Sequence, residues 1–279
     1  MNSLLAFSQV RIYKGFIDKY PIQLITNSYG KTVNAIYTYN KFDTPITING
    51  KLKNDTLTLF EKTEKGEVSA ILKFYGVDSA QNKLHGAWID QTKESRFKIE
   101  LIKSLEFDSF DAIALNRIEL LQAESTEKHY FKLLLSKKSS GNIRTVGVRV
   151  YRKGTDKLIQ EINVFGDFRS INGLWVGDYN FDGLPDFSVF GTSFSGANTS
   201  STYLLRTPNS EKYFKSEIGG LSLQFDSAKK EVYEHNQCCA GSKEEITTYK
   251  IVKNKMYLIK KKCLEYDEET ETFVEVKCE

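Results

Sequence analysis

Short segments of alternating apolar and polar residues run through most of this chain and limit it to an all-β fold. In the first hundred residues they include 35–39, 56–60 and 96–101, and turn residues such as Asn49-Gly50 separate them. Side chains alternate between the two faces of a strand, so this pattern is typical of half-buried strands. Their regular spacing predicts an antiparallel β meander that closes into a barrel or packs as a sandwich.

A second β region follows a looser stretch between Ser104 and Asn116. Its alternating segments begin at 131–135 and continue to 272–276. At 279 residues the chain is long enough for one large β domain or two ordinary ones. We therefore expect an N-terminal β-meander domain over residues 1–104 and a C-terminal β domain over residues 105–279.

The segment from Asp178 to Asp186 reads D-x-N-x-D-G-x-x-D and predicts a Ca²⁺ site. Calcium takes roughly six to eight oxygen ligands, and a short loop can supply them from alternate positions around a glycine turn. Gly183 occupies the turn. The predicted ligands are the side chains of Asp178, Asn180, Asp182 and Asp186 and the backbone carbonyl of Leu184.

This loop differs from an EF-hand in two respects. Position 12, where an EF-hand has a bidentate Glu, is Val189. The flanks 173–177 and 187–191 are short, apolar and Gly-bounded, so they are predicted strands rather than helices. The loop is then a structural clamp between two strands, with Asp186 as the closing carboxylate, as in integrin-type and dockerin-type calcium loops. An ordinary acidic turn is the alternative.

All four cysteines lie in the last quarter of the chain, which predicts two disulfides. Adjacent residues on a strand face opposite ways, so we expect Cys238 and Cys239 to bond separately to Cys263 and Cys278, in an order that the sequence leaves open. Four free thiols in a reducing cytosol are the alternative. Disulfides and a calcium site favour an exported protein that is periplasmic or associated with the outer membrane, its leader missing from the sequence given.

Charge and hydropathy argue against two classes of partner. Net charge is +3, from 39 basic and 36 acidic residues, so we expect no nucleic-acid partner. No apolar run approaches the roughly 20 residues of a membrane-spanning helix. The three histidines are scattered and no acid/base pair stands out, so we expect a protein that is not an enzyme.

The small, polar segment after the calcium loop is the candidate partner-binding site. Exposed loops on rigid β scaffolds often carry binding function, and Ca²⁺ bound immediately upstream would fix the base of such a segment. A surface loop without a partner is the alternative. The candidate residues are Ser193, Phe194, Ser195, Gly196, Ala197, Asn198, Thr199, Ser200 and Ser201.

Residues 177–187, followed by the Gly/Ser segment and Tyr203-Leu204, resemble the calcium-loop domain of exported bacterial immunity proteins related to periplasmic lysozyme inhibitors. In that family the domain accompanies secretion systems that deliver cell-wall hydrolases, and it places a loop in the hydrolase active site. The match covers roughly residues 130–260 and rests on one motif. It implies that this protein blocks a secreted, lysozyme-like hydrolase.

Two other functions stay open. A surface carbohydrate-binding or adhesive module with structural calcium would use the many aromatic residues, 13% of the chain, to stack on sugar rings. An enzyme acting on polysaccharide with a structural Ca²⁺ is disfavoured, because chance pairs of carboxylates occur in any chain with 36 acidic residues.

Overall fold

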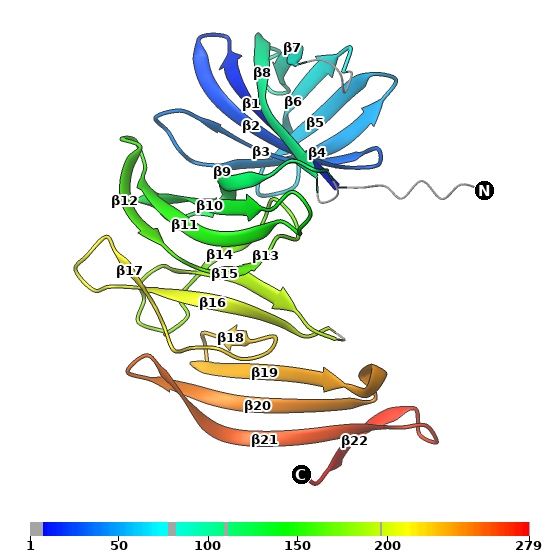
Figure 1. The fold of residues 1–279 in the computed structure, drawn as a ribbon, viewed down its shortest axis with the longest axis vertical. Helices are drawn as coiled ribbons and strands as arrows, with labels where there is room; N and C mark the ends of the chain where they lie inside the picture. The colour runs from blue at the N-terminus through cyan, green and yellow to red at the C-terminus, as the bar shows by residue number, and fades with distance from the viewer. Residues whose placement is uncertain (1–7, 78–81, 109–110, 196, 279) are drawn as a thin grey trace. The chain divides into compact units, whose positions relative to one another are not determined.

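The computed structural model describes residues 8–77, 82–108, 111–195 and 197–278, and most of them lie in strands (Figure 1). No α-helix occurs among these residues, and a single 3-10 turn, η1, covers Cys239–Gly241. The predicted all-β class is therefore confirmed. The chain divides into two compact units, the first formed by Met1–Asn163 and Phe168–Gly173 and the second by Val164–Asp167 and Leu174–Glu279.

Unit 1 begins with a closed antiparallel barrel, which confirms the predicted meander. Each strand pairs with the next along the chain, and β1 closes the barrel by pairing with β8. Residue 104, where the sequence predicts a domain boundary, lies inside β8. The barrel strands are β1 (Ser8–Ile17), β2 (Tyr20–Tyr29), β3 (Thr32–Tyr39), β4 (Ile46–Lys53), β5 (Thr56–Lys62), β6 (Val68–Tyr75), β7 (Lys83–Asp90) and β8 (Arg96–Asp108).

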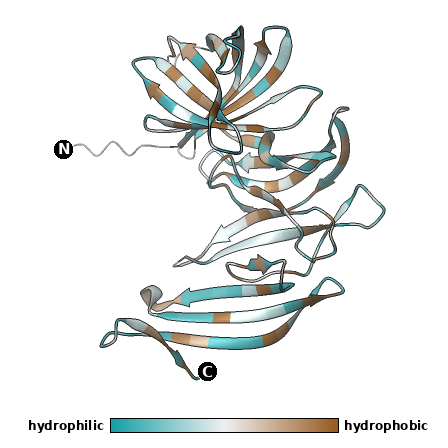
Figure 2. Cartoon of the chain, turned by 180° about the vertical axis from the view of Figure 1, so that it is seen from behind, coloured by the Kyte–Doolittle hydropathy of each residue, from teal (hydrophilic) through white to brown (hydrophobic). Residues whose placement is uncertain are grey.

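Apolar side chains from alternate positions fill the barrel. Tyr37, Leu59, Leu72 and Phe74 are fully buried members of this core. Hydrophobic bands cross the barrel strands in Figure 2, as the period-two pattern requires. Asn49 and Gly50 lie inside β4, so the turn predicted at these two residues is wrong. Strand packing is very tight at Gly50, where a Cβ atom would lie 1.8 Å from the carbonyl oxygen of Thr58.

A second antiparallel sheet completes unit 1. Its order is β12-β11-β10-β9, and β10 is buried along most of its length. The strands are β9 (Leu115–Ser125), β10 (His129–Lys137), β11 (Arg144–Arg152) and β12 (Lys157–Ile162).

Unit 2 contains two antiparallel sheets. The first has the order β14-β15-β16-β17 and the second β18-β19-β20-β21-β22. Hydrophobic residues are sparser along β20 and β21 than in the barrel (Figure 2). The strands of the unit are β13 (Gly166–Asp167), β14 (Leu174–Gly177), β15 (Asp186–Ser193), β16 (Thr199–Arg206), β17 (Tyr213–Lys215), β18 (Gln224–Asp226), β19 (Glu231–Cys238), β20 (Lys243–Val252), β21 (Lys255–Asp267) and β22 (Thr272–Val276).

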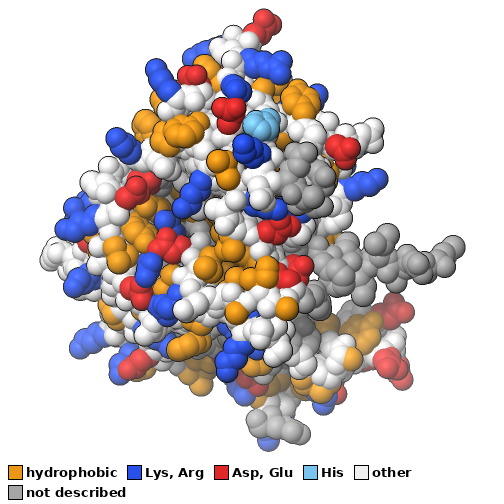
Figure 3. Space-filling view, turned by 45° about the horizontal axis from the view of Figure 1, so that its top comes forward, with side chains coloured by type: hydrophobic (Ala, Val, Ile, Leu, Met, Phe, Trp, Pro, Cys, Tyr) orange, Lys and Arg blue, Asp and Glu red, His pale blue; other side chains and the backbone are white. Residues whose placement is uncertain are grey.

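Basic and acidic side chains are interspersed on the face shown in Figure 3, with hydrophobic groups between them. Within the described ranges, no helix has the length and hydropathy needed to cross a membrane.

Candidate functional site

The predicted calcium loop connects β14 to β15 in unit 2. The two strands pair antiparallel, with Gly177 opposite Asp186 at the mouth of the loop. The predicted strand flanks are therefore confirmed. Phe181 and Gly183 both have positive φ, at 62° and 84°, so the chain turns sharply where the motif places its glycine.

Oxygen atoms of three predicted ligands point toward the loop backbone. Asp178 accepts backbone N–H bonds from Asp182 at Oδ1 (3.1 Å) and from Gly183 at Oδ2 (2.8 Å). Asp182 accepts the N–H of Leu184 at 2.8 Å. Asn180 Oδ1 accepts the N–H of Asp182 at 3.2 Å, and its Nδ2 donates to Asp182 Oδ2 at 2.9 Å. These are the local bonds by which Asp and Asn stabilise a turn.

Asp186 differs from the other loop carboxylates because it is fully buried. Its Oδ2 accepts the backbone N–H of Tyr179 at 3.0 Å, and its Oδ1 accepts that of Arg206 at 2.7 Å. Burial raises the pKa of Asp186 to about 6, and the charges of Asp182 and Asp178 act in the same direction, against the two backbone bonds. Asp186 thus ties the loop to the end of β16.

Aromatic side chains between the acidic positions anchor the loop in unit 2. The Tyr179 ring lies 4.9 Å from the rings of both Tyr203 and Phe225, in edge-on contacts. Phe181 also contacts Phe225, at 6.3 Å between ring centroids. The predicted ligands therefore alternate with aromatic residues along the loop. Tyr179 packs against the core cluster of unit 2, and Phe181 contacts Phe225 beside it.

The donor set is chemically suited to Ca²⁺, because carboxylate, amide and carbonyl oxygens are the ligands that calcium prefers. As placed, however, the described residues contain no group of three or more His, Cys, Asp or Glu side chains that could hold a metal ion. The carboxyl groups of Asp178, Asp182 and Asp186 all belong to this loop, and each accepts at least one backbone N–H bond.

The candidate partner segment lies at the other end of β15 from the calcium loop. Asp186 begins this eight-residue strand and Ser193 ends it, so the two sites are about 23 Å apart at roughly 3.3 Å per residue. The expectation that calcium fixes the base of the segment is wrong for this reason. Thr199, Ser200 and Ser201 belong to β16, and Gly196 lies outside the described residues.

A buried asparagine anchors the segment instead. Asn198 is 6% exposed, and its Nδ2 donates to Asn236 Oδ1 (3.1 Å) and to the Gln237 carbonyl (2.8 Å). Its Oδ1 accepts the Gln237 N–H at 3.0 Å. Ser222 adds a further contact, since its Oγ accepts the Thr199 N–H at 3.1 Å. The tip keeps exposed side chains at Ser193, Phe194, Ser195 and Ala197.

The predicted cysteine pairing is wrong. One disulfide joins Cys263 to Cys278, whose Cα atoms are 5.3 Å apart. Cys238 and Cys239 are both free and exposed, with their sulfur atoms 2.7 Å apart. Cys239 has φ of 58°, so it leaves the strand geometry from which opposite-facing side chains were expected.

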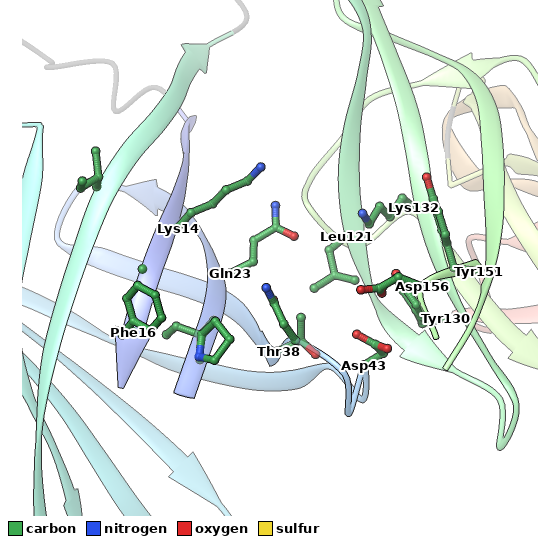
Figure 4. A pocket seen from close by; sticks show the side chains of 15 residues that line it. Lys14, Phe16, Gln23, Thr38, Asp43, Leu121, Tyr130, Lys132, Tyr151 and Asp156 are labelled. Atoms are coloured by element: carbon green, nitrogen blue, oxygen red, sulfur yellow. The ribbon is translucent and has the colours of Figure 1, made fainter. Parts of the chain in front are cut away.

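Unit 1 holds a cavity of about 550 Å³ that the sequence does not predict. Strands of the barrel line one side, and residues of β9–β11 and the following turn line the other (Figure 4). Polar and aromatic groups share its wall, a composition common in ligand sites. The labelled residues are Lys14, Phe16, Gln23, Thr38, Asp43, Leu121, Tyr130, Lys132, Tyr151 and Asp156.

Two carboxyl groups face each other in this cavity, those of Asp43 and Asp156 (Figure 4). Asp43 is 3% exposed and accepts the N–H of Gly154 at 2.9 Å. Burial raises its pKa, and the charge of Asp156 raises it further, while the Gly154 bond opposes them. Tyr130 donates its hydroxyl to Asp156. Both Asp residues occupy turns with positive φ, which in sequence look like any other turn.

Comparison of this chain with models of protein families, with curated proteins and with solved structures finds no match.

Proposed function

We propose that this protein is an exported binding protein that blocks a cell-wall-degrading, lysozyme-like hydrolase through the β15–β16 tip, residues 193–198. The observation that carries the proposal is an exposed aromatic residue on a fixed base. Phe194 is 49% exposed, and its N–H donates to the carbonyl of buried Asn198 at 2.9 Å. A loop with a fixed base loses less conformational entropy on binding than a loop without one, so it suits insertion into a preformed cleft.

The chemistry of the tip fits a cleft that binds polysaccharide. Ser193 and Ser195, the exposed neighbours of Phe194 in the chain, add hydroxyl groups to the tip. Hydroxyl and backbone groups can pair with the polar residues that such an enzyme uses for sugar, and an aromatic ring can occupy a sugar subsite. The tip therefore offers a peptide substitute for a glycan, without a bond that the enzyme can hydrolyse.

Calcium in the 178–186 loop is the second part of the proposal. Asn180 Nδ2 donates to Asn254 Oδ1 at 2.9 Å, so the loop contacts the β20–β21 hairpin. An ion held by Asp178, Asn180, Asp182, Asp186 and the Leu184 carbonyl would stiffen this junction between the two sheets of unit 2. Its role is structural, because the loop lies at the opposite end of β15 from the tip.

Export is supported by the Cys263–Cys278 disulfide, since such bonds persist in oxidising compartments such as the periplasm. A location in the periplasm or at the outer membrane would place the protein where an incoming cell-wall hydrolase acts.

Lysis of purified peptidoglycan by a panel of lysozyme-like hydrolases, with and without saturating protein, tests the function. We expect one member to form a complex and lose its activity. Phe194→Ala should weaken inhibition at least tenfold, and Phe273→Ala is a matched control because Phe273 is exposed to a similar extent, 43%, on β22. Undiminished lysis by all members, or equal effects of the two substitutions, would rule out the proposed mode of action.

A carbohydrate-binding function is the second candidate, and the unit 1 cavity favours it. Carboxyl, amide and amine groups of Asp43, Gln23 and Lys14 line the cavity, and the ring of Tyr151 lines its other side. Calorimetric titration with peptidoglycan fragments distinguishes the two functions. Binding that is lost in Asp43→Asn and kept in Phe194→Ala would favour the carbohydrate-binding module over the inhibitor.

A further inference from the structure

Cys238 and Cys239 occupy the turn that connects β19 to β20, at the start of η1 (Figure 1). Both are exposed, and their Sγ atoms are 2.7 Å apart. This separation is far inside the ordinary contact of two non-bonded sulfur atoms, and a covalent S–S bond is about 2.05 Å long. The two thiols therefore lie close to bonding distance in the folded chain.

The backbone of the turn produces this contact. Cys239 and Ala240 both have φ of 58°, in the left-handed region that non-glycine residues seldom adopt. Ser242 holds the turn, because its N–H and its Oγ both donate to the Cys239 carbonyl, at 3.2 and 2.8 Å. β19 and β20 pair antiparallel on either side of the turn, and Cys238 and Lys243 are the last pair of residues before it. On a regular strand the two side chains would point to opposite faces; here the turn brings them together.

We propose that Cys238 and Cys239 form a reversible vicinal disulfide and act as a two-electron redox site toward external disulfides. One cysteine thiolate attacks a sulfur atom of the external disulfide, forms a mixed disulfide and releases one thiolate. The thiolate of the other cysteine attacks the protein sulfur of that mixed disulfide, so the Cys238–Cys239 bond forms and a second thiolate leaves. The two cysteines lose two electrons and two protons, and the external disulfide becomes two thiols.

The proposed bond differs from Cys263–Cys278 in how readily it is reduced. Adjacent Cα atoms across a trans peptide are about 3.8 Å apart, below the usual disulfide range of about 4.4–6.8 Å. The Cα atoms of Cys263 and Cys278, at 5.3 Å, lie within that range. Disulfides with distorted geometry are more easily reduced. The chain thus carries one structural disulfide, Cys263–Cys278, and one cysteine pair that can change between a dithiol and a disulfide.

A cavity of about 270 Å³ lies next to the two cysteines and gives small molecules access to Cys238. It also brings Cys238 near the Cys263–Cys278 disulfide, with which Cys238 could exchange. Cys238, Cys263 and Cys278 all line the cavity. A small disulfide can therefore approach Cys238, and exchange of Cys238 with the Cys263–Cys278 bond is the alternative that an experiment has to separate.

The test equilibrates the full chain in buffers of varied reduced and oxidised glutathione, blocks free thiols with iodoacetamide and maps tryptic peptides by mass spectrometry. Cleavage after Lys230 and Lys243 puts both cysteines on peptide 231–243, whereas Cys263 and Cys278 fall on other peptides. We expect peptide 231–243 to change between a doubly alkylated form and an unalkylated form that lacks two hydrogen atoms. The Cys263–Cys278 bond should persist at glutathione ratios that reduce the vicinal pair.

Variants make the outcome decisive. Cys239→Ser should leave a stable glutathione adduct on Cys238, because the second attack is lost. The double variant Cys263→Ser/Cys278→Ser should keep the vicinal couple at an unchanged glutathione ratio. Stable adducts on both cysteines of the natural sequence, a covalent link from peptide 231–243 to either of the other cysteines, or two thiols that stay alkylatable in the most oxidising buffer would each overturn the proposal.

Discussion

The backbone N–H of Arg206 donates a 2.7 Å hydrogen bond to Oδ1 of Asp186, a carboxylate with no exposed surface. Tyr179 donates to the other oxygen, so one buried side chain joins the loop, β15 and the end of β16. Asp186→Ala would leave two buried N–H groups without acceptors, each costing about 1–3 kcal/mol. We expect a loss of about 2–5 kcal/mol in the free energy of unfolding, measured by urea denaturation in EDTA.

Asp182→Ala is the matched control, because Asp182 is exposed and its bonds stay within the loop. In EDTA it should cost well under half as much as Asp186→Ala. Equal losses for the two substitutions would show that Asp186 has no special structural role.

Calcium should stabilise the natural sequence and have little effect on Asp182→Ala. A ligand that binds only the folded state adds about 2.7 kcal/mol at a free concentration one hundred times its Kd. Calorimetry with calcium, after EDTA treatment and dialysis, measures binding, and thermal unfolding measures the stabilisation. Glu64→Ala, which removes an exposed carboxylate far along the chain from the loop, should respond to calcium as the natural sequence does. An identical Tm with and without calcium would show that the loop does not bind a stabilising calcium ion.

The β architecture and the strand flanks of the loop follow from the sequence, because both depend on local alternation and turn residues. The β20–β21 turn shows this, since Lys253 and Asn254 both take the positive φ of a two-residue hairpin loop, at 50° and 63°. Alternation alone leaves a barrel or a sandwich open. The choice depends on β1 pairing with β8, about 90 residues away, which no local pattern encodes.

The errors have two origins. Strand geometry predicts separate partners for Cys238 and Cys239, but Cys239 and Ala240 both have positive φ, so the chain leaves the strand at this point. The anchor of the partner segment was assigned to its sequence neighbour, the loop, whereas Asn198 is held by Asn236 and Gln237 in another sheet. Asp43 and Asp156 meet across more than a hundred residues. Contacts between distant segments decide the last two cases, and one sequence carries no signal for them.

Glu119 should make unit 1 sensitive to acid. Burial on its own raises the pKa of Glu119, but hydrogen bonds from Tyr151, Arg149 and Lys132 outweigh it and lower the pKa from 4.5 to about 2. A carboxylate with a lowered folded-state pKa stabilises the protein above its unfolded pKa, and this contribution disappears as pH falls from about 4.5 to 2. At 1.36 kcal/mol per unit, the shift sets an upper bound of about 3 kcal/mol, and solvent screening of this half-buried group lowers the contribution below it.

Glu119→Gln tests this because it cannot ionise. The difference in free energy of unfolding between the natural sequence and Glu119→Gln should be largest at pH 7 and should shrink steadily below pH 4.5. Glu64→Gln serves as the control, since Glu64 is exposed in the turn after β5. A difference for Glu119→Gln that stays constant from pH 7 to pH 3 would contradict the assignment.

Asn198 should control the order of the β15–β16 tip. Asn198 is buried and its side chain makes three hydrogen bonds, so Asn198→Ala removes them and leaves the Gln237 N–H without its acceptor. We expect hydrogen exchange in peptides covering residues 193–198 to accelerate at least tenfold, with a loss of about 1–3 kcal/mol in stability. Asn198→Asp keeps the acceptor for Gln237 but replaces both donated bonds with repulsion between oxygen atoms, so it should also increase the mobility of the tip.

Ser195→Ala, an exposed change in the same loop, should leave the rate of hydrogen exchange unaltered. If Asn198→Ala exchanges like Ser195→Ala, the tip is ordered by something other than Asn198, and the rigid base assumed for Phe194 is lost.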